Sequence, residues 1–394
     1  MHHTRDSLTI LVILALATGM AGATDVRYNV TPITMPQGYC SFLPWGLNDS
    51  GTVVGSILAV PGDDRVGIWS SSGVVADLGT FGQSYAWGEA INASGQIAGS
   101  SQLVTSSSPN LHYRNEAFTL QGGTPTFLGN LGTTGHDGEG TYANDINNAG
   151  QIVGASYYWD SGNYSSRGYV WENGTMTDIG IPVSGANCVL PQAINNNGVV
   201  VGYAYTPGQT ATQANRQGFL WTKQNGFRIL SNQLSTSGLD AYDVNDSGDV
   251  VGAYVSDSHY RPFYYNGVNM TALPLPSGAT DVQATSINNK GQIVGYETRH
   301  SANGNWLGDF PILWDNGEAY HIDDLVPNGF GPFNYSYRIK INNNGQITVS
   351  EQMTDGSYRG FLLTPIPEPS TLVSLGIGAI GMLLFIKMQG RVRL

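Results

Sequence analysis

Ile287-Asn288-Asn289-Lys290-Gly291-Gln292-Ile293-Val294-Gly295 is one copy of a pattern that recurs through most of this 394-residue chain. In each copy an aliphatic residue precedes Asn, two variable residues, Gly and a short aliphatic stretch. The glycines of successive copies lie 43 to 55 residues apart, which is the length of one propeller blade. The seven pairs of turn residues are Asn48 and Gly51, Asn92 and Gly95, Asn147 and Gly150, Asn195 and Gly198, Asn245 and Gly248, Asn288 and Gly291, and Asn342 and Gly345.

Each copy has the composition of a tight turn between two strands. Asn bonds its own backbone two residues on, and Gly supplies a positive φ. The glycine after the turn, as in Ile293-Val294-Gly295, predicts a close approach of neighbouring backbone or of an aromatic ring. An aromatic-rich third strand, such as 218–221, and a fourth, such as 227–230, follow in most repeats. Four short strands per repeat are typical of one blade.

The two ends of the repeat array complement each other. The seventh repeat lacks a fourth strand, because a proline-rich segment follows residues 360–363, and a surplus strand at 28–33 precedes the first turn. We therefore expect an all-β, seven-bladed β-propeller of four-stranded blades, closed by pairing of residues 28–35 with 357–363. An open β-solenoid is the alternative, but it would need capping ends.

Residues 1–23 have the layout of an export signal. A short charged start and an apolar run lead to Ala21-Gly22-Ala23, so we expect cleavage directed by Ala21 and Ala23. An uncleaved membrane helix is the alternative.

The C-terminus combines a proline-rich stretch from Pro365, an apolar run over 372–386, and basic residues that include Lys387. Such a run can just cross a thin bilayer with its cations on the cytoplasmic side, which leaves the body outside. Pro367, Glu368, Pro369 and Ser370 followed by this helix and tail resemble the PEP-CTERM sorting signal. An ordinary membrane anchor is the alternative reading.

The resemblance implies recognition by an exosortase-type sorting peptidase. The protein would then be anchored transiently in the inner membrane and end at the cell surface, the outer membrane or outside the cell. The chain divides into a signal peptide (1–23), the repeat body (24–365) and the sorting segment (366–394).

The body also resembles extracellular HAF-repeat proteins. Ala76-Asp77-Leu78-Gly79-Thr80-Phe81-Gly82 and the AsnxxGlyGlnIle turns fit that family, while Glu116-Ala117-Phe118 comes nearest to its His-Ala-Phe. The resemblance implies an extracellular repeat architecture and no established activity.

Charge and cysteine content narrow the possible partners. The net charge of −12, with 29 acids against 17 Lys plus Arg, provides no basic face, so a nucleic acid partner is not expected. A surface rich in Asn, Ser, Thr, Gln and Tyr suits hydrogen bonding to glycans or simply to water. Cys40 and Cys188 fall in equivalent loops of the first and fourth repeats, so we expect them to be too far apart to bridge. A single disulfide between them is the alternative.

Motifs for nucleophilic, zinc, phosphate or dinucleotide chemistry are lacking, and we expect no cofactor. Calcium is the one metal considered, because Asp145 and Asp243 precede two turns in the manner of a DxDxDG loop, and 135–140 is an isolated candidate. Backbone bonding by Asn explains all seven turns without calcium.

The tryptophans fall into two groups. Trp69, Trp171, Trp221 and Trp314 share one repeat position, which indicates core packing. Trp45 and Trp87, with Tyr142, lie just before turns, and Trp159 and Trp306 fall in variable loops, where recognition residues gather. Trp45, Trp87, Trp159 and Trp306 are the possible ligand contacts.

Two functions follow from these patterns. The first is a noncatalytic binding or structural role at the cell surface, linked to exopolysaccharide or biofilm. The second is a propeller enzyme acting on extracellular polysaccharide, which needs a pair of carboxylates drawn from Asp137, Glu139, Asp257 and Asp309.

Overall fold

A computed structural model describes residues 27–59, 63–71, 73–106, 112–132, 140–160, 163–206, 215–231, 234, 238–301, 303–327, 339–353 and 355–367. This part of the chain is built from β-strands, with a short 3-10 helix at Ile322–Leu325 (η2). The all-β prediction is confirmed. Within the described ranges no helix is long and apolar enough to span a bilayer, and the predicted anchor lies beyond them.

The strands occur in groups of four. The first three groups are β2 (Tyr39–Leu47), β3 (Val53–Ala59), β4 (Asp64–Trp69) and β5 (Ala76–Gly79); β6 (Tyr85–Ile91), β7 (Ile97–Ser106), β8 (His112–Gln121) and β9 (Thr124–Phe127); and β10 (Gly140–Ile146), β11 (Ile152–Asp160), β12 (Asn163–Glu172) and β13 (Thr175–Asp178). The next three are β14 (Cys188–Ile194), β15 (Val200–Tyr205), β16 (Gln217–Thr222) and β17 (Gly226–Ile229); β18 (Leu239–Val244), β19 (Val250–Ser256), β20 (His259–Tyr265) and β21 (Met270–Ala272); and β22 (Asp281–Ile287), β23 (Ile293–His300), β24 (Trp306–Asp315) and β25 (Glu318–His321). The last is β26 (Lys340–Ile341), β27 (Ile347–Gln352), β28 (Tyr358–Pro365) and, from the other end of the chain, β1 (Tyr28–Pro32).

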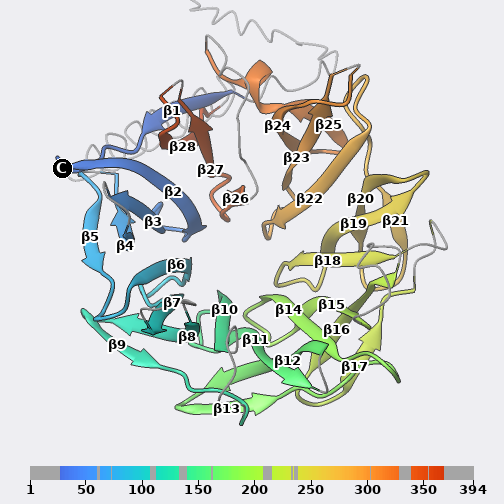
Figure 1. Ribbon diagram of the computed structural model, residues 1–394. Helices are drawn as coiled ribbons and strands as arrows, with labels where there is room; N and C mark the ends of the chain where they lie inside the picture. The colour runs from blue at the N-terminus through green and yellow to red at the C-terminus, as the bar shows by residue number, and fades with distance from the viewer. Residues whose placement is uncertain are drawn as a thin grey trace, which may run out of the picture.

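The groups are arranged around a common centre, and the first strand of each group lies nearest to it (Figure 1). Four groups are separate four-stranded sheets, and the three groups from β6 to β17 join into one 12-stranded sheet. Single parallel pairs, Gly140 with Asn115 and Ser166 with Cys188, make those joins. The centre is thus lined by one strand from each group, called the inner strands below: β2, β6, β10, β14, β18, β22 and β26.

The two ends of the body pair with each other. β1 runs antiparallel to β28 from Tyr28 opposite Pro365 to Pro32 opposite Phe361, and the two strands lie side by side in Figure 1. The Ile366 amide donates to the Arg27 carbonyl at 2.8 Å, just beyond the last pair. These two strands were predicted to pair over 28–35 and 357–363, and the observed ladder covers Tyr28–Pro32 and Phe361–Pro365 instead.

A β-bulge recurs in the inner strands. Each of β2, β6, β10, β14, β18 and β22 shifts its pairing by one residue near its end, as at Asn144 between Ala143 and Asp145. Opposite the bulge stands the second-strand glycine that was predicted to allow close approach. A Cβ built on Gly154 would lie 1.9 Å from the Tyr142 carbonyl oxygen, and one on Gly252 would lie 2.0 Å from that of Asp240. Only Gly fits there.

The core lies between neighbouring groups. Phe42 and Trp69 of the first group pack in one cluster with Leu362 of β28, so the first and last groups share a core. Trp171 and Trp314 are buried in two other clusters, and Trp221 packs against a fourth. The predicted structural role of these tryptophans is confirmed.

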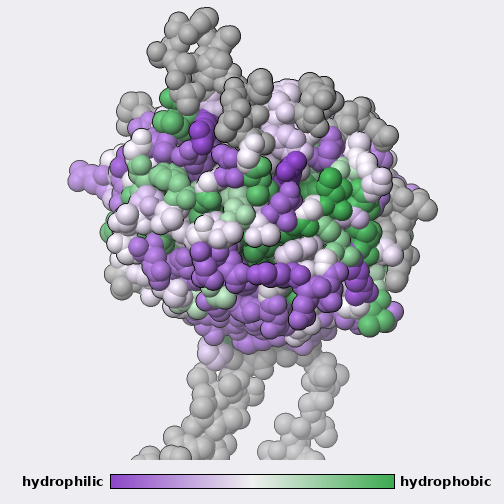
Figure 2. Space-filling view, turned by 90° about the horizontal axis from the view of Figure 1, so that it is seen from below, coloured by the Kyte–Doolittle hydropathy of each residue, from purple (hydrophilic) through white to green (hydrophobic). Residues whose placement is uncertain are grey.

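The outer surface of the body is mixed in polarity. Figure 2 views the body edge-on from the side of β9, β13 and β17, where apolar patches lie between polar ones. No disulfide joins Cys40, which is exposed, to Cys188, which is buried. They lie within the first residues of the inner strands β2 and β14, not in loops as predicted, because those strands begin earlier than the repeat pattern showed.

Candidate functional site

The seven turn asparagines are all buried, with 3 to 6% of each residue exposed. Each Oδ1 accepts the amides two and four residues further along the chain. For Asn147 these are Ala149 at 3.1 Å and Gln151 at 3.0 Å. This is the local turn bonding that the sequence predicted.

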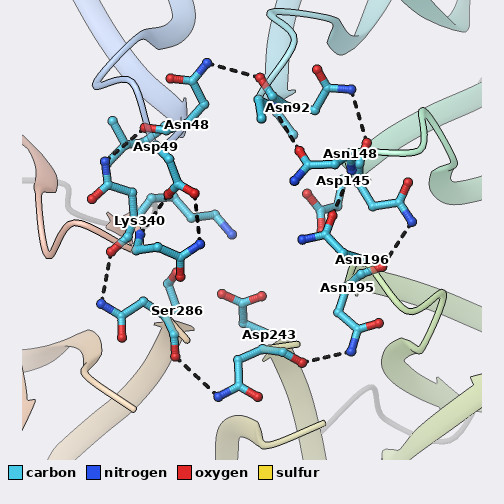
Figure 3. Close-up of a pocket in the computed structure, with 18 of the residues that line it drawn as sticks. Asn48, Asp49, Asn92, Asp145, Asn148, Asn195, Asn196, Asp243, Ser286 and Lys340 are labelled. Carbon is cyan, nitrogen blue, oxygen red and sulfur yellow. Dashed lines mark hydrogen bonds between the residues drawn. The ribbon is translucent and has the colours of Figure 1, made fainter. Parts of the chain in front are cut away.

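The side-chain nitrogen of each turn asparagine links neighbouring repeats. Asn147 Nδ2 donates to the Asn195 carbonyl at 3.0 Å, and every other turn Asn does the same to the next one at 2.8 to 3.3 Å. Asn342 donates to the Asn48 carbonyl at 2.9 Å across 294 residues of sequence, so the seven bonds form a closed cycle (Figure 3).

A second set of bonds runs beside this cycle. The residue after each turn Asn accepts, through its side-chain oxygen, the amide of the equivalent residue in the preceding repeat, as Asn196 does from Asn148 at 2.9 Å. Six such bonds of 2.8 to 2.9 Å occur. The seventh position is Ala93, which has no side-chain acceptor for the Asp49 amide, so this set has one gap.

These bonds leave the turn asparagines no lone pair directed at a ligand, and their role is structural. The oxygens that a calcium ion would need at the turns already accept amide hydrogens. No cluster of three or more His, Cys, Asp or Glu side chains suited to a metal occurs in the part of the chain that the structure covers.

The candidate site lies in the layer beneath the turns. The residue three positions before each turn Asn lines one cavity of about 270 Å³. These seven residues are Trp45, Glu89, Asn144, Gln192, Tyr242, Thr285 and Ile339. In six of the inner strands this is the bulged residue, and a bulge turns its side chain away from the sheet. Gln283, Tyr296 and Lys340 complete the lining.

The wall at β18 and β22 is a network of polar groups. The Tyr242 hydroxyl lies 3.1 Å from Asp240 Oδ2 and 3.0 Å from Gln283 Oε1. Burial, and then the charge of Asp240, hold the pKa of Tyr242 well above its usual value, so it is a hydroxyl at neutral pH. Arg216 donates to the same Asp240 oxygen at 2.9 Å and neutralises that buried carboxylate.

Asn144 on β10 and Gln192 on β14 have unused hydrogen-bonding capacity. Asn144 donates to the Pro191 carbonyl at 2.6 Å, which leaves its oxygen available. Gln192 has only long contacts, 3.4 and 3.5 Å, to carbonyls of its own strand. Glu89 is 8% exposed, and its charge adds to burial in raising the pKa of Tyr142.

Acidic groups dominate the centre. Asp145, Asp243 and Lys340 point inside the ring of turns (Figure 3). Asp145 Oδ2 accepts the Ile194 amide at 2.8 Å, and Asp243 Oδ2 accepts the Ile287 amide at 3.0 Å, so each carboxylate ties its repeat to the next.

The pKa of Asp145 is raised to about 6. Burial is the main cause and Asp243 adds to it, while Lys340 and two backbone amides oppose it. Lys340 is the one cation among the residues that line either cavity.

The four candidate tryptophans do not lie together. Trp45 lines the cavity, whereas Trp87 donates from Nε1 to Asp64 at 2.9 Å. Trp159 and Trp306 are 45% and 37% exposed. They lie at ends of β11 and β24 and not in loops as predicted, because these hairpin strands extend further than the sequence indicated.

The acids of the enzyme hypothesis are not seen as a pair. Asp257 is exposed in the turn after β19 and contacts Ser256. Asp309 is 1% exposed, accepts from Thr298 at 2.7 Å and from the Trp306 indole, and burial raises its pKa. Asp137 and Glu139 lie outside the described residues, as do Ala21, Ala23, Glu368, Pro369 and Ser370.

The sequence prediction missed most of the cavity. Of its ten lining residues only Trp45 was proposed as a ligand contact. A signal was present, because the position three before each turn Asn holds a different residue in every repeat while the turn itself repeats.

Comparison with family models finds two matches. Residues 365–387 match the PEP-CTERM protein-sorting motif. The C-terminus carries an exosortase sorting motif. That motif indicates an exported protein that associates with the cell surface. Residues 80–240 match a protein of unknown function, DUF3466. No curated protein matches the chain.

Solved structures with a similar course of the chain include a streptogramin B lyase, at 10% identity, covering 85% of this chain and 97% of that one, with a TM-score of 0.48. The six-bladed Aleuria aurantia lectin has 12% identity, coverages of 78% and 97%, and a TM-score of 0.37. The gluconolactonase XC5397 from Xanthomonas campestris has 8% identity, coverages of 86% and 97%, and a TM-score of 0.40. These values are too low for a ligand or a reaction to be transferred to this chain.

Proposed function

We propose that this protein is a noncatalytic carbohydrate-binding protein of the cell surface, linked to exopolysaccharide, and that its central cavity holds one sugar residue of a chain. The observation that carries the proposal is the lining of the cavity. Trp45, Tyr242 and Tyr296 supply aromatic faces, and Glu89, Asn144, Gln192 and Gln283 supply planar polar groups. Aromatic rings pack on the apolar face of a sugar, and amides and carboxylates bond its hydroxyls.

The size of the cavity favours a small group. At about 270 Å³ it lies just below the roughly 300–1,000 Å³ of most small-molecule pockets. A single sugar ring is of this scale, whereas several rings are not.

The charge of the lining favours some sugars over others. Glu89, Asp145 and Asp243 outnumber Lys340 around the two cavities, which share Lys340 in their linings. Because like charges repel more strongly in a partly buried site, neutral and amino sugars should bind better than uronic acids.

The proposal includes the finer architecture. The groups of four strands would be seven blades of one propeller over residues 24–365, with HAF-type repeats and with β1 completing the last blade. Support comes from the closed cycle of turn hydrogen bonds and from the β1 to β28 pairing. Residues 1–23 would be removed after Ala23, and exosortase would act at Pro367 to Ser370, releasing a body first held by the 372–386 helix.

Binding of polysaccharides by the purified full chain tests the function. We expect neutral or amino-sugar polymers to bind, and Trp45→Ala to weaken that binding at least about tenfold, or ~1.4 kcal/mol. Phe127→Ala, which removes an exposed aromatic from the outer strand β9, is the matched control and should bind as the wild type. Lack of binding to any polysaccharide, or equal effects of both variants, would contradict the proposal.

A further inference from the structure

The two ends of the described body leave it at one point. Tyr28 pairs with Pro365, and the Ile366 amide donates to the Arg27 carbonyl at 2.8 Å. The export signal and the predicted anchor are therefore joined to the body side by side, although they lie at opposite ends of the sequence.

That point is at the turn end of the molecule. Leu363 pairs with Ile347, the first residue of β27 after the last AsnxxGly turn. Gln346 donates to Thr364 at 3.2 Å, and a Cβ built on Gly345 would lie 3.5 Å from Pro365 Cγ. The chain thus enters and leaves the described body beside the seventh turn.

The opposite end of the molecule carries different groups. β2 runs from Tyr39 at this far end to Leu47 at the turn, a length of roughly 30 Å at about 3.3 Å per residue. The hairpins at the far end expose Trp159, Trp306 and Leu307. The turn end exposes polar residues such as Asp49, Asn148 and Asn289, and its exposed apolar residues, such as Val74 and Val268, are smaller than tryptophan.

We propose that the body stands on the membrane with its AsnxxGly turns facing the bilayer and its other end, with the exposed tryptophans, facing outward. The proposal rests on the proposed anchor at 372–386, because the few residues between Ile366 and that segment tether the turn end close to the bilayer. We expect the turn end not to attract anionic lipid, since acids such as Asp49 and Asp246 outnumber Lys340 among the charged residues that line its central opening. The attachment should therefore survive high salt.

The native cysteines make a direct test possible. Cys40 is exposed near the start of β2 at the far end, and Cys188 is buried. Ala93→Cys in a Cys40→Ser background moves the reactive thiol to an exposed position at the turn end. Each full-length protein, labelled with the same maleimide donor dye, is placed in phosphatidylcholine vesicles that carry an acceptor dye on lipid headgroups.

We expect energy transfer to be at least twofold greater from position 93 than from position 40, and unchanged in 0.5 M salt. Equal thermal unfolding midpoints of the two labelled proteins serve as the folding control. Equal or reversed transfer overturns the orientation and leaves the anchor and the glycan proposal standing. A full chain that does not float with the vesicles overturns the anchor and the orientation together, while polysaccharide binding by the same sample tests the glycan proposal separately.

Discussion

The seven turn asparagines and the seven residues three positions before them form two layers of the same repeats. The two layers differ in how their side chains use their polar groups. In the first layer seven identical side chains use both amide atoms on backbone, as Asn147 does within its own turn and with Asn195. In the second layer seven different side chains, from Trp45 to Ile339, surround one cavity. Where the repeats agree, their polar groups hold the ring together, and where they differ, their side chains line a cavity.

The largest expected effect is on stability. Asn147→Ala removes the acceptor of two buried amides and the link to Asn195, and should lower the free energy of unfolding by roughly 3 kcal/mol. Urea denaturation measures it. Asn148→Ala, one residue further on and exposed, removes the acceptor of the Ala93 amide; it is the control and should cost about 1 kcal/mol or less. Equal losses would mean that the buried cycle has no special role.

The second prediction concerns Gln192, an amide side chain in the layer that lines the cavity. Gln192→Ala should change the unfolding free energy by less than about 0.5 kcal/mol, because its contacts are long, and should weaken binding of the preferred polysaccharide roughly three- to tenfold. Titration calorimetry and thermal unfolding on one sample separate these effects. Full binding with lost stability would reverse the roles assigned to the two layers.

The third prediction concerns the pH dependence of stability that Asp145 causes, at a position between the two layers. Because the folded pKa of Asp145 is about 6, above its ordinary value of 3.8, the folded chain binds this proton more tightly than the unfolded chain. This group's contribution to stability should therefore fall as pH rises from about 4 to about 6, and then level off.

Asp145→Asn removes that titration. Its unfolding free energy should exceed that of the wild type by an amount that grows across the same pH range, to roughly 1–3 kcal/mol at pH 7. Urea midpoints at pH 4, 5, 6 and 7 measure the difference, and a difference independent of pH would contradict the assignment.

The smallest effect should come from closing the gap in the second set of turn bonds. Ala93→Asn supplies an oxygen for the Asp49 amide and should raise the unfolding free energy by about 0.5–1 kcal/mol. Ala93→Leu, similar in size but without an acceptor, should bring no gain. A gain from Leu as well would point to packing instead of hydrogen bonding.

The sequence predicted the features that depend on local backbone chemistry. Asn and Gly at fixed spacing imply the turns, and a missing last strand with a surplus first one implied the partnership of β1 and β28. It could not predict features that depend on how repeats meet. The link from Asn342 to Asn48 spans 294 residues, and the bulge that turns Gln192 inward leaves no mark on the alternation of apolar residues.

The strand lengths were missed for a related reason. Cys188 and Trp306 were placed in loops because turn motifs mark where hairpins begin and say nothing of where long strands stop. Pairing across neighbouring groups, as between Ser166 and Cys188, sets those limits.

The partnership of β1 with β28 also sets the order of assembly during export. The first strand to reach the outside of the cell must wait, unpaired, until nearly all of the remaining body has crossed, because its partner is the last strand to emerge. Contacts between residues so distant in sequence form late and slowly. The intermediate would therefore present an open strand edge, and secretion helpers that shield such edges should act from the emergence of β1 until β28 has crossed.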